Sequence, residues 1–343
     1  MKTIDLRSDT VTLPTDEMMD SIARARLGDD VSREDPTVNE LEDLAARTFG
    51  TEGALLFPSG TQSNLTALMA HCDPGEEVIM EAESHVYYYE VGGMSAIAGL
   101  IPRLVEGRRG VYTPDQVREV YRGDDLHFPR SSLLEIENTH NRAGGTVWTV
   151  DQVAAVADEA RRRGMKVHMD GARVFNAAVA LGAKVSDFAR QVDSVSFCLS
   201  KSLSAPVGSL LVGSEEFIER CRKVRKMLGG GMRQAGIIAA PGLVAIRDMV
   251  DRLADDHRNA RLLAEGIQGM GLGHVDLESV QTNIVVMHTD DLEMDAHQFS
   301  FRAAEQGVLV SVFGPRRVRF VTHRGIGRED IEEALSRLEA LLQ

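Results

Sequence analysis

The chain has 343 residues, 43% of them hydrophobic and 26% charged, which is typical of a globular protein large enough for a main domain with a smaller appendage. Its net charge of −14 argues against a general nucleic-acid or anionic-membrane binder, and no apolar run approaches the roughly 20 residues of a spanning helix. The amino terminus lacks the apolar stretch of a signal peptide, and the three cysteines form no metal-site pattern, so we expect a cytoplasmic protein without a bound metal.

The first part of the chain predicts a polar arm followed by two helices. Residues 1–15 are largely polar and contain one proline near their end. A helix start is predicted at Thr15, where acids occupy the first turn. After a loop over 28–36, the apolar spacing predicts a second helix over 37–48.

A strand predicted over 54–57 leads into a turn rich in serine, glycine and threonine, and then into a helix over 65–71. Backbone N–H groups and the helix dipole at such a junction attract an anion, so Ser59, Gly60 and Thr61 are candidates for binding a phosphate. The segment lacks the Gly-Lys-Ser/Thr ending of a Walker loop, and a simple capped helix start explains it equally well.

Histidine and tyrosine side chains gather after the next strand, which is predicted over 78–81. His85 lies two residues before the consecutive Tyr87, Tyr88 and Tyr89, in a chain with only 5% aromatic residues. Such a cluster can stack on a flat ring and form hydrogen bonds around it. A half-buried helix start at a subunit interface is an equal alternative.

Strand and helix patterns alternate from about residue 54 to 228, as in βαβ units around a mostly parallel sheet. Further strands are predicted over 99–105, 132–137 and 166–170, and helices over 113–121, 150–163 and 215–228. Ligands bind beyond the carboxyl ends of such strands. The candidate site residues therefore follow the strands: Ser59, Gly60, Thr61, His85, residues 138–140, Asp170, Arg173 and Lys201.

The segment 195–208 predicts a buried strand that presents one lysine, Lys201, at its carboxyl end. Burying an ammonium group without a partner is costly. Desolvation lowers the pKa of a lysine toward the neutral amine that condenses with an aldehyde, so a Schiff-base lysine is one explanation. The plainer alternative is a lysine that extends from a strand end into solvent.

After a glycine-rich break at 229–234, the chain predicts a separate α+β region. A helical stretch over 236–270 is expected in two pieces, with Pro241 ending or kinking it. Short strands and two helices are then predicted at 283–287, 295–305, 308–312, 317–321 and 329–341. We expect three parts: an amino-terminal arm over 1–15, a large cofactor-binding domain over 16–245 and a small carboxy-terminal α+β domain over 246–343.

Together the candidate residues match what pyridoxal 5′-phosphate requires of a protein. Lys201 can form the covalent aldimine, and Asp170 can keep the pyridine nitrogen protonated so that the ring accepts electrons. The turn at 59–61 can bind the phosphate, and His85 can stack on the ring. Arg173 can bind a substrate carboxylate through two parallel hydrogen bonds. Taken singly, a turn-capping aspartate and a surface ion pair would explain Asp170 and Arg173.

Seven motifs carry a resemblance to a known family, and they lie at residues 5–12, 57–64, 137–141, 168–173, 198–201, 226–235 and 319–323. With these motifs the sequence resembles the low-specificity L-threonine aldolases along nearly its whole length. The resemblance implies an α/β fold of the aspartate-aminotransferase-like, fold type I superfamily of pyridoxal-phosphate enzymes. It also implies a homotetramer, built as a dimer of dimers that share active sites.

The resemblance assigns roles that spacing does not supply. For the cofactor it implies Lys201 as the covalent residue, Asp170 as the pyridinium partner, His85 as the stacking residue, Ser59, Gly60 and Thr61 at the phosphate, and Arg173 and Arg233 nearby. For the substrate it implies Ser8, Arg173 and Arg319 around the carboxylate, with Tyr89 and His127 near the hydroxyl or side chain. Arg233 is expected to reach an active site across a subunit boundary.

The implied reaction is retro-aldol cleavage of L-threonine, L-allo-threonine and similar β-hydroxy-α-amino acids to glycine and an aldehyde. His85 is the first candidate base for the hydroxyl proton, with His127 or a water as alternatives. The rival functions are β-elimination or transamination on the same frame, and, more distantly, a non-catalytic binding protein. One departure from the family is that Ser32 and Arg33 replace the usual tyrosine and glycine, which leaves side-chain preference open.

Overall fold

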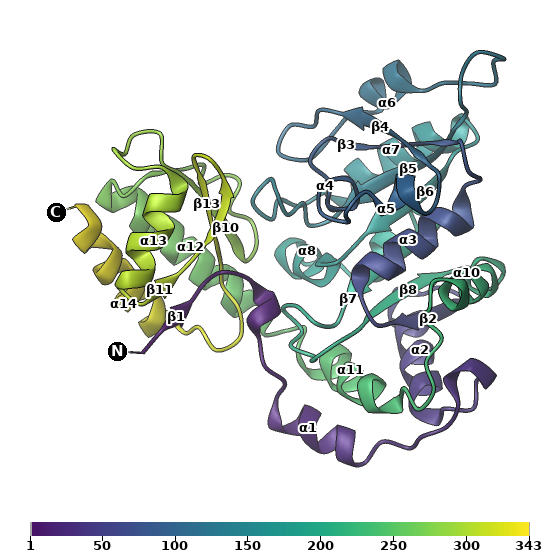
Figure 1. The fold of residues 1–343 in the computed structure, drawn as a ribbon, viewed down its shortest axis with the longest axis horizontal. Helices are drawn as coiled ribbons and strands as arrows, with labels where there is room; N and C mark the ends of the chain where they lie inside the picture. The colour runs from purple at the N-terminus through teal and green to yellow at the C-terminus, as the bar shows by residue number, and fades with distance from the viewer. Residues whose placement is uncertain (1, 343) are drawn as a thin grey trace.

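A seven-stranded sheet forms the centre of the larger lobe in the computed structural model, which describes residues 2–342 (Figure 1). Its strands, in spatial order, are β2 (Gly53–Phe57), β8 (Ser209–Gly213), β7 (Ser194–Cys198), β6 (Lys166–Asp170), β5 (Ser131–Glu137), β3 (Glu77–Glu81) and β4 (Ile101–Val105). Among these seven, β8 alone runs in the direction opposite to the other six, so the predicted mostly parallel sheet is confirmed. The segment between β7 and β8, which carries Lys201, is consequently a return loop at the carboxyl edge of the parallel strands.

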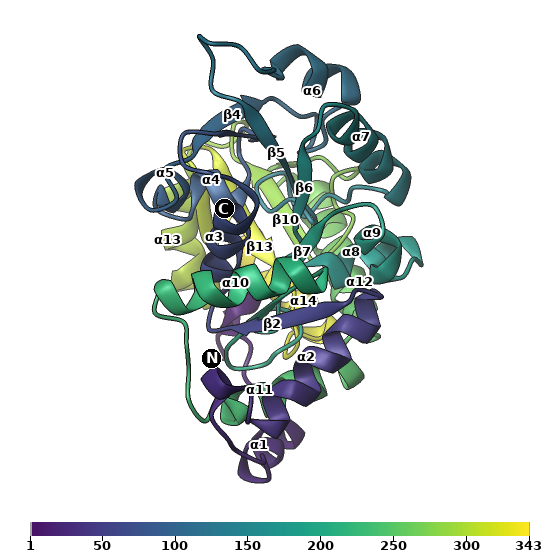
Figure 2. The same cartoon turned by 90° about the vertical axis from the view of Figure 1, so that its right-hand side faces the viewer.

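Helices cover both faces of this sheet (Figure 2). One face bears α3 (Gly60–His71) and α10 (Glu215–Met227), with the short α4 (His85–Tyr88) and α5 (Gly93–Ala96) beside α3. The rest of the larger lobe contains α1 (Asp16–Ala23), α2 (Pro36–Phe49), α6 (Pro114–Val120), α7 (Val150–Arg162), α8 (Val174–Leu181), α9 (Val185–Ala189) and α11 (Gly236–Asp248). Every residue of β2, β3, β7 and β8 is buried, as expected for strands covered on both faces.

The smaller lobe is a four-stranded antiparallel sheet packed against helices (Figure 1). Its elements are α12 (Leu253–Met270), β9 (His274–Val275), β10 (Ile284–His288), α13 (Ala296–Glu305), β12 (Ser311–Gly314), β13 (Arg317–Val321) and α14 (Arg328–Glu339). The arm adds to this lobe, because β1 (Ile4–Asp5) pairs in parallel with β11 (Val308–Leu309) and buries Ile4 and Leu6 in the apolar core there.

Three predicted boundaries were wrong, and a strand was missed. Helix α3 begins at Gly60 rather than at residue 65, because Ser59 Oγ accepts from the backbone N–H of Gln62 and caps the helix at 3.2 Å. Strand β7 ends at Cys198, three residues before Lys201. Helix α11 continues through Pro241, whose burial against the core outweighs the missing backbone donor, and the break falls at 249–252. Strand β8 was not predicted.

Apolar side chains form a main cluster in the larger lobe and another in the smaller lobe. The division into parts at residues 15 and 245 stays a prediction. None of the helices within residues 2–342 combines the length and the apolar character needed to cross a membrane.

Candidate active site

A cavity of about 270 Å³ lies at the carboxyl edge of the central sheet. It collects six of the predicted residues from four separate segments: Ser59, Gly60, Thr61, His85, Asp170 and Lys201. The parallel strands explain this convergence, because β2, β6 and β7 all deliver the chain to the same edge.

The first turn of α3 forms one wall of this cavity. Gly60 and Thr61 lie in the first turn of the helix, where no preceding turn supplies carbonyl acceptors, so their backbone N–H groups have no helical partners. A Cβ at Gly60 would meet Cys198 Sγ at 3.0 Å, so a larger residue would close this part of the cavity. The wall therefore offers an anion a helix amino terminus and room to approach it.

Asp170 ends β6 and is buried, with its carboxylate held by two donors. Its Oδ1 accepts from the backbone N–H of Ala172 at 3.0 Å, and its Oδ2 accepts from Asn64 Nδ2 at 2.9 Å. Asn64 lies four residues after Gly60, one helical turn along the same face of α3. The carboxylate is therefore fixed in orientation at the cavity wall.

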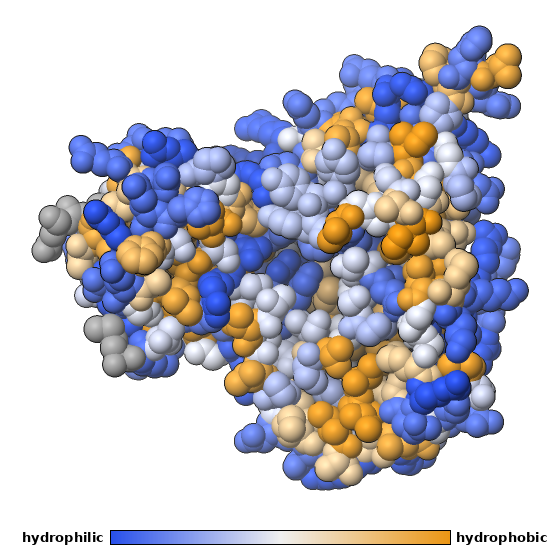
Figure 3. Space-filling view, in the orientation of Figure 1, coloured by the Kyte–Doolittle hydropathy of each residue, from blue (hydrophilic) through white to orange (hydrophobic). Residues whose placement is uncertain are grey.

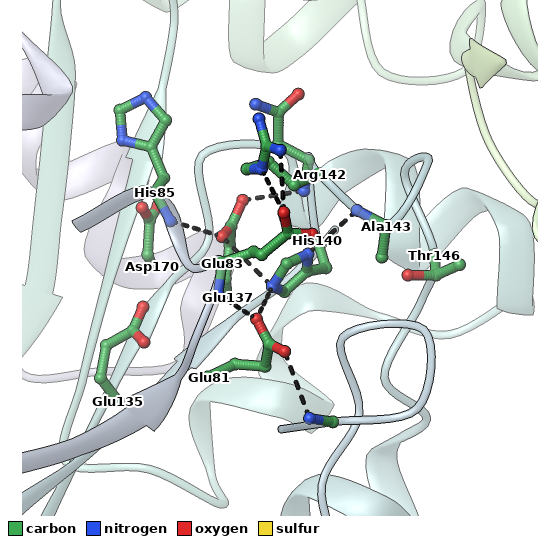
Figure 4. Close-up of polar contacts among 12 residues, drawn as sticks. Glu81, Glu83, His85, Glu135, Glu137, His140, Arg142, Ala143, Thr146 and Asp170 are labelled. Carbon is green, nitrogen blue, oxygen red and sulfur yellow. Dashed lines mark hydrogen bonds and ion pairs between the residues drawn. The ribbon is translucent and has the colours of Figure 1, made fainter. Parts of the chain in front are cut away.

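His85 begins α4 and is tied to two buried carboxylates. Its backbone N–H donates to Glu137 Oε2 at 2.7 Å (Figure 4). Its Nδ1 contacts Glu90 Oε1 at 3.1 Å. Burial by itself lowers the pKa of His85, but the Glu90 hydrogen bond and the charge of Asp170 outweigh burial, so the pKa is raised. With Nδ1 engaged by Glu90, Nε2 is the ring nitrogen without a partner among residues 2–342.

Lys201 lies in the β7–β8 return loop, and its main chain is held from two sides. Its carbonyl oxygen accepts from Thr12 Oγ1 at 3.0 Å and from the backbone N–H of Ser204 at 2.8 Å. Across the described residues, its Nζ has neither a hydrogen-bond nor an ion-pair partner. The amine at the cavity wall is thus available for a reaction.

Two arginines predicted at the substrate carboxylate lie next to each other but outside the lining of the cavity. Arg173 is buried and donates to both oxygens of Asp9, at 2.7 Å and 2.6 Å. Arg319 donates to Asn141 Oδ1 at 2.8 Å, and its buried Nε has no partner in the described part of the chain. Burial and the charge of Arg173 lower the pKa of Arg319 to about 10. An anion bound beside these two arginines would offset their like charges.

The loop after β5 positions Arg319 through a network of buried acids, drawn in Figure 4. Glu137 Oε1 accepts from the backbone N–H of Asn141 at 2.8 Å, and Asn141 in turn accepts from Arg319. His140 Nε2 contacts Glu81 Oε2 at 3.0 Å at the base of the loop. The candidate residues 138–140 therefore belong to a loop that supports the site.

Four other predicted residues do not line the cavity. Ser8 caps a short 3₁₀ segment, Tyr89 accepts from Arg142 Nη1 at 2.8 Å, and Arg233 pairs with Asp29 at 2.8 Å. His127 is exposed in the loop before β5, and therefore lies at the amino edge of the sheet, opposite the cavity. Within one chain the structure does not bring His127 to the cavity, and its role there stays a prediction that requires a second protomer.

His85, Glu90 and Asp170 also place one possible metal ligand each within 4.8 Å of one another. However, Asn64 Nδ2 donates to Glu90 at 2.9 Å as well as to Asp170, and Glu90 contacts the His85 ring. These atoms satisfy one another, so we assign the group to hydrogen bonding.

The residues present fit pyridoxal phosphate. The cavity joins a free lysine amine, a buried carboxylate for a ring nitrogen, an imidazole for the ring face and a helix amino terminus for a phosphate. The partnerless Nε of Arg319 supplies a donor for an amino acid carboxylate.

A family model described as beta-eliminating lyase matches residues 5–290. The chain belongs to the beta-eliminating lyase family. One relative, the probable low-specificity L-threonine aldolase 2 of Arabidopsis thaliana, is 42% identical to this chain. The match covers 99% of this chain and 98% of the relative. The resemblance found in the sequence is thereby confirmed.

Solved structures confirm the predicted fold. A threonine aldolase of Leishmania major has a TM-score of 0.85 at 16% identity and covers 99% of this chain and 100% of that one. An aspartate aminotransferase double mutant of Thermus thermophilus has a TM-score of 0.75 at 18% identity, covering 99% and 92%. The chain therefore has the aspartate-aminotransferase-like fold.

Sequence reasoning missed three residues that hold the predicted ones: Asn64, Glu90 and Asp9. The sequence could have pointed to Asn64, because its four-residue spacing from Gly60 puts both residues on one face of a helix that starts at residue 60. Asp9 lies within a motif that carried the family resemblance, but its partner Arg173 is 164 residues away. Nothing in the sequence distinguishes Glu90 from a surface acid.

Proposed function

We propose that this chain is a pyridoxal-phosphate-dependent aldehyde-lyase that cleaves L-threonine, L-allo-threonine and related β-hydroxy-α-amino acids to glycine and an aldehyde. The observation that carries the proposal is the convergence of Lys201, Asp170, His85 and the first turn of α3 on one cavity. A threonine-aldolase relative that matches the full length of the chain supports the choice of reaction.

Four groups would hold the cofactor. Lys201 Nζ would form the covalent link, Asp170 would contact the ring nitrogen, His85 would cover a ring face, and the first turn of α3 would bind the phosphate. When bound, the cofactor supplies an electron-poor ring that accepts the electron pair of a breaking bond.

Arg173 and Arg319 would bind the substrate carboxylate, with Ser8 nearby. Both guanidinium groups are held by buried partners, Asp9 and Asn141, so they can orient the substrate as well as bind it. The orientation of the substrate decides which bond at Cα is broken, and this chain would favour the Cα–Cβ bond.

His85 would take the proton of the β-hydroxyl group. Its Nδ1 is occupied by Glu90, so Nε2 is the atom that can exchange a proton with the substrate. As that proton leaves, Cβ becomes the carbonyl carbon of the aldehyde, the Cα–Cβ bond breaks, and Cα takes up a proton to give glycine. A water, or His127 from a second protomer, remains the alternative base.

The proposal includes a cytoplasmic homotetramer with shared sites. Apolar side chains are exposed on and beside α1 and α11, including Leu13, Met19, Leu27 and Ile237, and Figure 3 shows apolar surface gathered at that end of the larger lobe. Such surface is typical of a protein–protein interface. Arg233 and His127 lie outside the cavity of their own chain, which supports a role across a subunit boundary.

A second candidate reaction is β-elimination, which the description of the matching family model favours. The same lysine, aspartate and arginines would serve it. An assay that measures glycine and aldehyde against pyruvate or another keto acid separates the two reactions.

The test of the covalent site is borohydride reduction of the protein with pyridoxal phosphate, followed by peptide mapping. We expect the label on Lys201, and Lys201→Ala should lose the label and the lyase activity together. A label on Lys184 or Lys226, or full activity of Lys201→Ala, would refute the proposal.

A further inference from the structure

A chain of hydrogen bonds runs through the interior of the larger lobe and ends on Asp170. Asn64 Nδ2 lies 2.9 Å from Asp170 Oδ2, and His168 Nε2 lies 3.3 Å from Asn64 Oδ1. His168 Nδ1 lies 2.8 Å from Ser194 Oγ, which lies 2.8 Å from His71 Nε2. The strand period explains the line-up, because His168 and Asp170 share one face of β6, and His168 pairs in register with Ser194.

Each hydrogen bond in this series has only one possible donor and one possible acceptor. Asn64 Nδ2 can only donate, so Asn64 Oδ1 must accept from His168 Nε2–H. A neutral His168 with its proton on Nε2 accepts at Nδ1 from Ser194, whose oxygen accepts from His71. Burial lowers the pKa of His168 to about 4, and burial also lowers the pKa of His71, so both rings are neutral at pH 7.

Asn64 is fully occupied at the end of this chain. Its two N–H groups donate to Asp170 and to Glu90, each at 2.9 Å. Its oxygen accepts from Ser196 Oγ at 2.6 Å and from His168 at 3.3 Å. A flipped amide would turn its oxygen toward two carboxylates and its N–H groups toward the His168 and Ser196 donors, so the partners at both ends together fix which end faces Asp170.

The far end of the chain reaches a second cavity, of about 450 Å³, which His71 lines together with Lys166 and Asp193. Lys166 starts β6 and Asp193 precedes β7, so this cavity lies at the amino edge of the sheet, opposite the first. An amide cannot pass on a proton without changing its bonding, so the chain orients groups and does not conduct protons.

We propose that His168 is a positioning residue for Asp170, acting through Asn64. This inference rests on the proposed function, because Asp170 is the group that would contact the ring nitrogen of the cofactor. His168 does not line the cavity, and its contribution is to keep an N–H of Asn64 aimed at the carboxylate.

The test compares pyridoxal-phosphate binding by the full-length protein and three variants. His168→Phe removes both ring nitrogens, His168→Gln keeps an N–H donor near the position of Nε2, and His71→Phe makes the matched change at the far end, where the Ser194 hydroxyl can still serve His168. We expect His168→Phe to weaken binding roughly tenfold or more, and His168→Gln and His71→Phe to stay within about threefold. The absorbance of the cofactor bound to His168→Phe should also titrate at a higher pH, because a less firmly protonated ring nitrogen withdraws fewer electrons from the group bonded to Lys201.

Nitrogen-15 spectra of the cofactor-free protein give an independent readout. The His168 signal is identified as the one that disappears in His168→Gln. In the wild type, this signal should be that of a neutral ring protonated at Nε2 at every pH from 5.5 to 8. A ring protonated at Nδ1, or equal binding and titration by wild type and His168→Phe, would overturn the inference. Failure of the wild type to bind pyridoxal phosphate would instead refute the proposed function, and the two outcomes are therefore distinguishable.

Discussion

Asp9 is the residue whose replacement should damage the structure of the site most. It is fully buried and accepts from Arg173 at 2.7 Å and 2.6 Å, from Ser202 Oγ at 2.7 Å and from Asn283 Nδ2 at 3.3 Å. Burial raises the pKa of Asp9, but Arg173 outweighs burial and holds the pKa far below its ordinary value. The carboxylate is therefore charged at every pH at which the protein would be assayed.

Asp9→Asn keeps the shape of the side chain but leaves the buried guanidinium of Arg173 without its counter-charge, close to Arg319. Removing one partner of a buried ion pair costs about 3–5 kcal/mol of folding free energy. The asparagine oxygen can still accept one hydrogen bond, so we expect about 3 kcal/mol. At roughly 2–4 °C per kcal/mol, the melting temperature should fall by roughly 6–12 °C.

Thermal unfolding followed by circular dichroism at pH 7 measures this loss. Asp5→Asn is the matched control, because Asp5 lies in the same arm and pairs with Arg7, whose side chain is half exposed. Exposed pairs contribute about 0–1 kcal/mol, so the control should lose no more than about 4 °C. An external carboxylate such as acetate should protect Asp9→Asn more than wild type. A loss in Asp9→Asn no greater than in Asp5→Asn would refute the reasoning.

Three further predictions concern the backbone and pH. Arg33 adopts a left-handed conformation with φ of 60°, so Arg33→Gly should be more stable than Arg33→Ala by about 1 kcal/mol in denaturant unfolding, and equal midpoints would contradict the assignment of strain. A Cβ at Gly171 would lie 2.8 Å from the Ser196 carbonyl oxygen, so Gly171→Ala should lose about 1–3 kcal/mol in the same assay, and an unchanged midpoint would show that the turn can relax. His168 has a folded-state pKa of about 4 against 6.5 for the unfolded chain, so the unfolded state binds more protons between these values, and stability should be lost as pH falls from 6.5 to 4. Between pH 7 and 5, His168→Gln should lose about 2 kcal/mol less than wild type, and identical losses would exclude this contribution.

The sequence predicted the parts of the site that follow strands, because the topology of a parallel sheet brings strand ends together. The segments that carry Ser59, Asp170 and Lys201 were predicted without any knowledge of contacts, and they line one cavity. The supporting residues could not be found in this way. Asn64 contacts Asp170 across 106 positions and Glu90 across 26, and such pairings are decided by tertiary packing that leaves no local pattern.

Asp9 also explains why the amino-terminal arm and the smaller lobe carry motifs characteristic of the site. The arm pairs with β11 of the smaller lobe, and a few residues later Asp9 holds Arg173 of the larger lobe. Asn283, just before β10, donates to Asp9, and so does Ser202, the residue after Lys201. One carboxylate thus contacts the larger lobe, the smaller lobe and the loop that carries Lys201 from its place in the arm. A small shift of the smaller lobe would therefore move the hydrogen-bond partners of Arg173 and Ser202 together. The positions of Arg173 and Lys201 therefore depend on the same packing contacts, to which the arm and both lobes contribute.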